Sequence, residues 1–199
     1  MVKKIIITGG LGYIGTELCK IYSGVSWHHK IIVIDNRFIS ERVNQIRNWN
    51  MEFIHGDILN KELVNKYFKD ADIVHHLAGI TDVPRTKSES NSEKDKKIIL
   101  VGEKGTNNIL EAISNECKII FPSTHVVYEG IDKVKNDIKE NEETKPVLSY
   151  SSSKAVNEKQ LKKSGKNYVI LRLGSVYGYS TDTARIDIMP NLFSKISSE

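Results

Sequence analysis

The sequence has 199 residues, of which 39% are hydrophobic and 27% charged, a composition typical of one sizeable globular domain. Its net charge of +4 comes from 29 Lys and Arg scattered among 25 Asp and Glu, whereas a nucleic-acid-binding protein would gather positive charge into a patch. No apolar run approaches the roughly 20 residues that cross a membrane, and glycines interrupt the short run after Lys3 and Lys4 before a signal peptide forms. We therefore expect a cytoplasmic protein with neither nucleic acid nor membrane as a partner.

Six short, β-branched apolar runs recur along the chain and predict the strands of a sheet. They lie at residues 5–7, 31–34, 52–54, 73–77, 119–121 and 168–171. Such continuous runs are typical of parallel strands that are buried on both faces. Segments with apolar residues at helical spacing alternate with them, at 13–22, 62–68 and 105–113. This alternation predicts an α/β fold, a doubly wound parallel sheet of the Rossmann type.

Three further segments complete the predicted organisation. Residues 84–96 are polar with almost nothing to bury, so we expect a mobile loop there. Residues 132–146 are similarly charged and should also be irregular. A last helix is expected around residues 191–196, shortly before the sequence stops at Glu199.

Cys19 and Cys117 lie in apolar contexts without metal-type spacing, which predicts two small core residues and no metal site.

A glycine-rich turn follows the first predicted strand directly. Gly9, Gly12 and Gly15 have the spacing at which one glycine makes a tight turn, one lets the backbone approach a pyrophosphate, and one allows the next helix to pack closely. Phosphates would lie at the N-terminus of the helix at 13–22, where backbone N–H groups favour negative charge. Because a strand precedes the turn and a helix follows it, the turn predicts a dinucleotide site.

Asp35 ends the second predicted strand, about 20 residues beyond the last glycine of the turn. An acid at this place hydrogen-bonds the ribose hydroxyls of the adenosine half of a dinucleotide. Its carboxylate would repel a 2′-phosphate, which favours NAD over NADP as the cofactor. Arg37 could pair with such a phosphate, so NADP stays open as an alternative.

Tyr150 and Lys154 are four residues apart ahead of a helical stretch at 155–161, so both side chains can point into one cleft. A tyrosine ordinarily has a pKa near ~10, and a neighbouring ammonium group and an oxidised nicotinamide ring both lower that pKa. Thr124 follows the fifth predicted strand, at the carboxyl edge of the sheet where α/β folds bind ligands. These three residues are the candidate catalytic set.

With these motifs, the chain resembles the extended short-chain dehydrogenase/reductases, and specifically the NAD-dependent epimerase/dehydratase family that acts on nucleotide sugars. The likeness covers nearly the whole chain. It rests on six segments: Thr8 to Gly15, Asp57-Ile58, His76 to Gly79, Gly105 to Ala112, Ser123 to Tyr128, and Leu171 to Gly178.

The resemblance implies NAD as the cofactor and a nucleotide sugar as the substrate. The residues expected to contact NAD are Gly9, Gly12, Tyr13, Ile14, Gly15, Asp35, Asn36, Asp57, Ile58, Leu77, Ala78, Gly79, Ser123, Tyr150 and Lys154. By the same likeness, residues 1–180 form the NAD-binding Rossmann domain with the catalytic Thr, Tyr and Lys. Residues 181–199 would begin a shortened substrate-binding region, because members of the family usually continue with a small substrate-binding domain.

The likeness also implies roles for the candidate catalytic residues. Tyr150 would take a proton from a sugar hydroxyl, Lys154 would lower its pKa and hold the nicotinamide ribose, and Thr124 would hydrogen-bond the reacting oxygen. Hydride would pass from the sugar carbon to NAD and, in an epimerase, return to the other face of the keto intermediate. We therefore predict a nucleotide-sugar epimerase. A reductase, a decarboxylase or a dehydratase of the same family, and a non-catalytic NAD-binding module, are the alternatives; a homodimer is left open.

Several positions depart from the pattern of the family. His125 and Val126 stand where its dehydratases carry Asp-Glu, so a dehydratase is disfavoured. Gly102 replaces a frequent Asn, which removes a polar contact near the site. Glu129 follows Tyr128 where the family has glycine, and Ser175 replaces a frequent Asn near the substrate.

Overall fold

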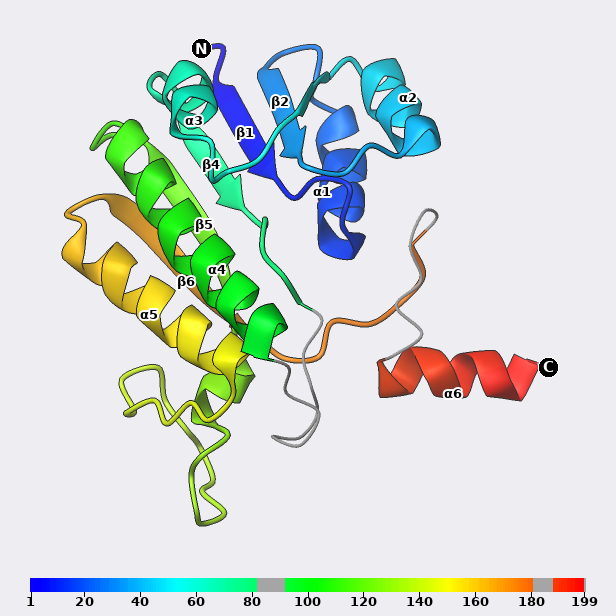
Figure 1. Cartoon of the computed structure of the whole chain (residues 1–199). Coiled ribbons are helices and arrows are strands. Elements are labelled where there is room, and N and C mark those ends of the chain that lie inside the picture. Colours follow the sequence, from blue (N-terminus) through cyan, green and yellow to red (C-terminus); the bar gives the residue numbers. More distant parts are fainter. Residues whose placement is uncertain (82–91, 181–187, 199) are drawn as a thin grey trace.

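The computed structural model describes residues 1–81, 92–180 and 188–198. Six parallel strands form one sheet in the order β3-β2-β1-β4-β5-β6, and helices cover both of its faces (Figure 1). The strands are β1 (Lys4–Thr8), β2 (Lys30–Asp35), β3 (Glu52–His55), β4 (Ile73–His76), β5 (Lys118–Thr124) and β6 (Asn167–Leu173). The helices are α1 (Tyr13–Ser23), α2 (Ser40–Asn48), α3 (Lys61–Phe68), α4 (Ser92–Ala112), the 3₁₀ helix η2 (His125–Tyr128), α5 (Ser149–Lys163) and α6 (Met189–Ser198).

Strand β1 lies in the middle of the sheet because both β2 and β4 pair with it. Ile6 stands opposite Ile32 on one side and Val74 on the other. After β3 the chain crosses back over β1 to begin β4, so the strand order reverses between β1 and β4. In open α/β sheets, ligands bind in the crevice at the carboxyl ends of the strands beside such a reversal. The predicted doubly wound parallel sheet of the Rossmann type is confirmed.

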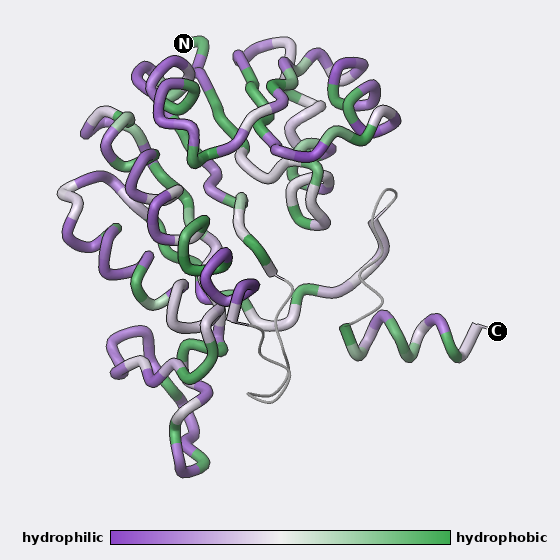
Figure 2. The backbone as a smooth tube through the Cα atoms, in the orientation of Figure 1, coloured by the Kyte–Doolittle hydropathy of each residue, from purple (hydrophilic) through white to green (hydrophobic). Residues whose placement is uncertain are grey.

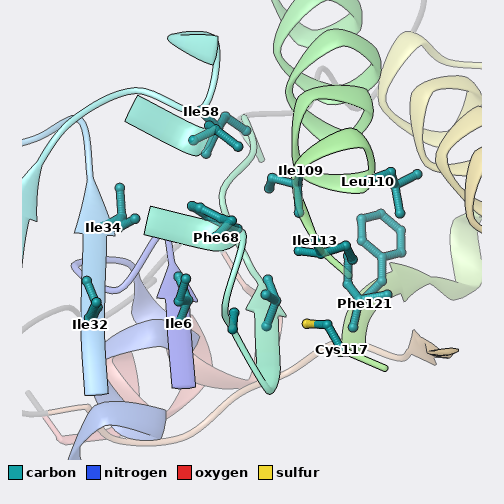
Figure 3. Close-up of a cluster of buried hydrophobic side chains, with 14 of the residues drawn as sticks. Ile6, Ile32, Ile34, Ile58, Phe68, Ile109, Leu110, Ile113, Cys117 and Phe121 are labelled. Carbon is teal, nitrogen blue, oxygen red and sulfur yellow. The ribbon is translucent and has the colours of Figure 1, made fainter. Parts of the chain in front are cut away.

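Two apolar layers hold the helices on the sheet. On one face, α3 and α4 bury Phe68 and Ile109 against the strands (Figure 3). Helix α5 adds Leu161 to the same cluster. On the other face, α1 and α2 bury Cys19 and Val43. The strands are mainly hydrophobic along their length, as expected for a sheet covered on both sides, while the helices carry hydrophilic outer turns (Figure 2). This packing fixes the carboxyl ends of the strands, where the candidate site lies.

All six predicted strands are present, and the predicted helices lie within or beside α1, α3, α4 and α5. The expectation of a loop over 84–96 is wrong for residues 92–96, which begin α4; residues 84–91 lie outside the described residues. Glu93 and Asp95 fall in the first turn of α4, where acidic side chains are favoured by the helix dipole, and Ile98 is buried one turn later. Helix α2 was not predicted, because it buries only a short apolar stripe, Val43 and Ile46.

Two segments extend beyond the layered core. Residues 132–146 contain no helix or strand, as predicted, and project from the region of η2 and α5 (Figure 1). Helix α6 contains the predicted stretch 191–196, and its Asn191 accepts a hydrogen bond from the Gly178 N–H at 3.0 Å. Residues 181–187 of the predicted substrate-binding region lie outside the described residues. Among the helices that the structure describes, none is both long and apolar enough to cross a membrane.

Candidate active site

A cleft of about 1170 Å³ lies at the carboxyl ends of the strands. It brings together all sixteen residues that the sequence singled out: Gly9, Gly12, Tyr13, Ile14, Gly15, Asp35, Asn36, Asp57, Ile58, Leu77, Ala78, Gly79, Ser123, Thr124, Tyr150 and Lys154. The first twelve come from the β1 to β4 half of the sheet, which we call the cofactor side (residues 1–81). The last four come from β5 and α5, within what we call the catalytic side (residues 118–173).

The glycine-rich turn is a backbone cradle that side chains would fill. Gly9 has a φ of +67°, and a Cβ atom there would lie 2.8 Å from the Ala78 backbone nitrogen. A Cβ atom on Gly15 would lie 2.2 Å from the Gly9 carbonyl oxygen. Gly12 is the N-cap of α1 and caps it with no side chain, so the helix begins with its backbone facing the cleft. This arrangement fits the pyrophosphate of a dinucleotide.

Asp35 is nearly inaccessible, at 5% exposed, and ties the end of β2 to the glycine turn. Its Oδ2 accepts a hydrogen bond from the Leu11 N–H at 2.9 Å. Its Oδ1 accepts from the Arg37 N–H at 3.0 Å and faces the Arg37 Nε at 3.3 Å. The Arg37 guanidinium also reaches over the turn, because its Nη2 lies 3.7 Å from the place of a Cβ on Gly12. The acid predicted for the ribose therefore stands beside a cation at the same end of the cleft.

The same end of the cleft is closed by residues that follow β3. The Asn36 Nδ2 donates to the Asp57 Oδ2 at 3.1 Å, and the Leu59 N–H donates to the Asp57 Oδ1 at 2.9 Å. The Ile58 carbonyl accepts from the Asn108 Nδ2 of α4 at 2.9 Å. These contacts fix the two predicted pairs, Asn36 with Asp35 and Asp57 with Ile58, along the wall of the cleft.

His76, at the end of β4, positions the segment from Leu77 to Gly79. Its Nδ1 lies 3.1 Å from the Thr8 Oγ1, and its Nε2 lies 2.9 Å from the Thr106 Oγ1. The Thr8 Oγ1 also accepts from the Ala78 N–H at 3.0 Å. Burial, aided by the charge of Lys154, lowers the pKa of His76 to about 3. The neutral ring thus links β1, β4 and α4 beneath the cleft.

Tyr150 and Lys154 both lie on α5, one turn apart. The Lys154 Nζ donates to the Pro122 carbonyl at 2.8 Å and lies 4.4 Å from the Phe121 ring centroid. The same Nζ lies 5.9 Å from the centroid of the Tyr150 ring. Burial lowers the pKa of Lys154 to about 8, although the charge of Glu158 partly opposes this shift. An ammonium group beside the phenol favours its ionised form.

Thr124 ends β5 and is the N-cap of η2, with its Oγ1 accepting from the Val126 N–H at 3.3 Å. The next residue, His125, also lines the cleft, and its Nδ1 lies 3.1 Å from the Leu173 carbonyl oxygen. Leu173 and Ser175, at and after the end of β6, complete this side of the cleft. The hydroxyl of Thr124 therefore stands in the same cavity as Tyr150 and Lys154.

A buried ion pair beneath the catalytic side was missed in the sequence. Glu158 receives the Arg172 Nε at 2.9 Å and the Arg172 Nη2 at 2.6 Å, and the Ser123 Oγ donates to it at 2.6 Å. Burial alone would raise the pKa of Glu158, but these hydrogen bonds and the charge of Arg172 keep it below its ordinary value. The available signal was spacing, because Glu158 follows Lys154 by the same four residues that separate Lys154 from Tyr150.

Gly102, a departure from the expected pattern, marks a close contact between α4 and α5. A Cβ atom there would lie 2.1 Å from the Ser153 Oγ. The Gly102 carbonyl accepts from the Asn157 Nδ2 at 3.0 Å. Polar groups of α5, from Ser153 and Asn157, occupy the space that a side chain at position 102 would need. The absence of a side chain at Gly102 therefore lets α5 pack closely against α4.

The fold and the cleft define a Rossmann-type dinucleotide-binding protein. The NAD dependent epimerase/dehydratase family matches residues 5–199, and the chain belongs to this family.

Two curated relatives and one solved structure show the range of similarity. The chain is 31% identical to a dTDP-D-glucose 4,6-dehydratase of Dictyostelium discoideum, over 89% of this chain and 44% of that protein. It is 31% identical to a putative UDP-glucose 4-epimerase of Methanocaldococcus jannaschii, over 89% of this chain and 57% of that protein. A UDP-glucuronic acid 4-epimerase from Bacillus cereus, solved with UDP-glucuronic acid and NAD, matches with 26% identity and a TM-score of 0.76, over 98% of this chain and 63% of that one. The chain thus spans about half the length of these curated relatives.

Proposed function

We propose that this chain binds NAD in the cleft and serves an NAD-dependent epimerisation of a nucleotide sugar. One observation carries the proposal: Thr124, Tyr150 and Lys154 line the same cavity as the glycine-rich turn. The cradle at Gly9 and Gly15 and the acid at Asp35 suit the phosphates and the ribose of the cofactor. When bound, NAD would supply the acceptor for a hydride.

The residues of the catalytic side divide the remaining work. Tyr150 is the group that would remove a proton from a sugar hydroxyl, since the Lys154 ammonium beside it favours the phenolate. The Thr124 hydroxyl would hydrogen-bond the reacting oxygen and orient it. Lys154 itself is kept in place by the Pro122 carbonyl, so its charge stays near the Tyr150 ring.

The two residues after Thr124 favour an epimerase over a dehydratase. Elimination of water needs an acid and a base beside the reacting carbon. These two residues are His125 and Val126, and the Val126 side chain has no group that can act as an acid or a base, so the two cannot form such a pair. Glu129 does line the cleft, but hydrogen bonds from the start of α5 engage its carboxylate. The acid-base pair of an elimination is therefore not supplied at this position.

The first test is the thermal stability of the chain with NAD, and then with UDP-, GDP-, dTDP- and CDP-sugars added to the NAD-loaded chain. A ligand that binds the folded state raises the melting temperature. We expect a shift with NAD and a further shift with one class of nucleotide sugar, which is then assayed for epimerisation. No shift with NAD would contradict the proposal at its base.

The second test is the Tyr150→Phe variant. Because a positioned proton-transfer group contributes about 10²–10⁴-fold to a rate, we expect turnover to fall by that factor while NAD affinity is kept. Tyr179→Phe is the matched control, since Tyr179 is 84% exposed. A chain that binds NAD but gives no turnover, with Tyr150→Phe indistinguishable from the parent, would instead be an NAD-binding module.

A further inference from the structure

The start of α5 lacks a side-chain acceptor at its own N-cap position. The N-cap is Leu148, whose side chain accepts no hydrogen bond. The first backbone N–H groups of a helix have no acceptor within the helix. Tyr150 lies two residues after Leu148, in this first turn. Its place in the cleft therefore depends on how the turn is held.

Glu129 supplies a carboxylate acceptor from another element, in addition to the Ser151 Oγ of α5, which accepts from the Leu148 N–H at 3.2 Å. The Glu129 Oε1 accepts from the Val147 N–H at 2.7 Å and from the Leu148 N–H at 2.7 Å. The Ser151 Oγ donates to the same oxygen. A carboxylate at this end of a helix is also favoured by the helix dipole. One side chain thus holds both the chain entering α5 and the third residue of its first turn.

The backbone around Glu129 is itself fixed against the segment that leads into α5. The Lys145 N–H donates to the Val127 carbonyl at 2.8 Å, and the Gly130 N–H donates to the Lys145 carbonyl at 2.8 Å. Glu129 directly follows η2, and Thr124 is the N-cap of η2. The carboxylate therefore joins the element that begins at Thr124 to the helix that carries Tyr150.

We infer that Glu129 is a positioning residue, which fixes the first turn of α5 and so sets the Tyr150 hydroxyl relative to Thr124. Glu129 acts through the helix, since three donors from α5 and its approach engage its Oε1. The catalytic part of this inference rests on the proposed function, whereas its structural part does not.

Lys154 is held independently of Glu129. It lies one turn deeper in α5 and is bound to the Pro122 carbonyl, and the Glu158–Arg172 pair anchors the helix one turn further on. Loss of the Glu129 carboxylate should therefore loosen the first turn of α5, which carries Tyr150, while leaving Lys154 and the glycine-rich turn in place. This separation makes the inference testable.

The test compares Glu129→Ala and Glu129→Gln with the parent chain. Glu142→Ala is the matched control, because Glu142 lies in the irregular segment that precedes α5 and its carboxylate pairs with the Lys135 ammonium at 2.6 Å. Backbone amide exchange over residues 147–151 reports on the first turn of α5. NAD-induced thermal shift reports on the cofactor side, and kcat and KM are measured with the nucleotide sugar that stabilises the NAD-loaded parent.

In Glu129→Ala we expect amide exchange over 147–151 to be about tenfold faster, in keeping with the loss of a helix cap. We expect kcat to fall by about the same factor, with KM and NAD affinity within about twofold. Glu129→Gln keeps an acceptor oxygen and should restore most of both properties. Glu142→Ala should match the parent in every measurement.

Unchanged exchange in Glu129→Ala would overturn the inference, and faster exchange with unchanged kcat would overturn the positioning role. A fall in NAD affinity as large as the fall in kcat would mean a general loss of structure and would also overturn it. If the parent shows no turnover with any nucleotide sugar, the proposed function fails; the exchange of residues 147–151 then decides the inference alone.

Discussion

The cofactor side of the cleft is shaped by backbone packed closely against its neighbours, whereas the catalytic side is shaped by hydrogen bonds between buried polar side chains. At the glycine-rich turn, Gly9 and Gly15 leave no room for a Cβ atom. Beneath Tyr150 and Lys154, the side chains of Ser123, Glu158 and Arg172 satisfy one another. The first arrangement should fail when atoms are added, and the second when atoms are removed.

The largest expected effect tests the catalytic side. Glu158→Ala would leave the Arg172 guanidinium, whose side chain is 12% exposed, without its carboxylate. Removing one partner of a buried ion pair typically costs about 3–5 kcal/mol in the free energy of unfolding. Urea denaturation of the parent and the variant measures this difference.

A double variant separates the pair from the packing around it. Glu158→Leu combined with Arg172→Met replaces both charges by apolar side chains, which often restores stability at a buried pair. We expect the double variant to recover most of the loss seen in Glu158→Ala. If Glu158→Ala lowers the free energy of unfolding by less than about 1 kcal/mol, the pair contributes no more than a surface ion pair. The catalytic side would then not depend on buried polar contacts, and the contrast with the cofactor side would be wrong.

The next effect concerns His76, a buried polar side chain that lies on the cofactor side. It is an exception to the rule that backbone packing shapes that side. Burial lowers its pKa from 6.5 to about 3 in the folded chain. Between these values the unfolded chain binds more protons, so stability is fully present above pH 6.5 and is lost as the pH falls toward 3. As the pH falls from 6.5 to 4.5, protonation of this group should lower the free energy of unfolding by roughly 2–3 kcal/mol.

The check is the slope of unfolding free energy against pH. We expect His76→Asn, less stable at neutral pH, to have a shallower slope than the parent, because the variant has no imidazole to protonate. His28→Asn, at an exposed position, should keep the slope of the parent. Equal slopes for the parent and His76→Asn would mean that the buried ring does not carry this acid sensitivity.

The smallest effect is the difference in stability between alanine variants of two glycines that have the same φ, one on each side. Gly9 and Gly165 both have a φ of +67°, but only Gly9 has backbone atoms at the place of a Cβ; Gly165 has open space within 4 Å. Alanine in this conformation costs about 1–2 kcal/mol at either position. The close contact at Gly9 should add about 1–3 kcal/mol. Gly9→Ala should also weaken the NAD-induced thermal shift. If Gly9→Ala and Gly165→Ala lose the same free energy of unfolding, close packing at Gly9 does not contribute to stability.

The sequence predicted most of the cofactor side and only part of the catalytic side. Strands and the glycine turn are visible because their residue types repeat locally, as at 5–7 and in Gly9 to Gly15. The Ser123–Glu158–Arg172 contacts join residues 35 and 14 positions apart, so no local pattern reveals them. Glu129 stood out in the sequence as a departure from the family pattern, but its carboxylate meets α5 only through the fold. The roles of the sixteen residues in the cleft stay predictions.

The strand order has a consequence for how the chain is made. The β1, β2 and β3 pairings use only the first 55 residues, which leave the ribosome before the other strands. Until β4 emerges, β1 lacks the partner for its second edge, and an unpaired strand edge is a site for wrong pairing. Strand β6, together with Arg172, is translated last among the strands. Until then the Glu158 carboxylate has no Arg172 guanidinium to pair with, so the polar network cannot be completed before β6 has been made.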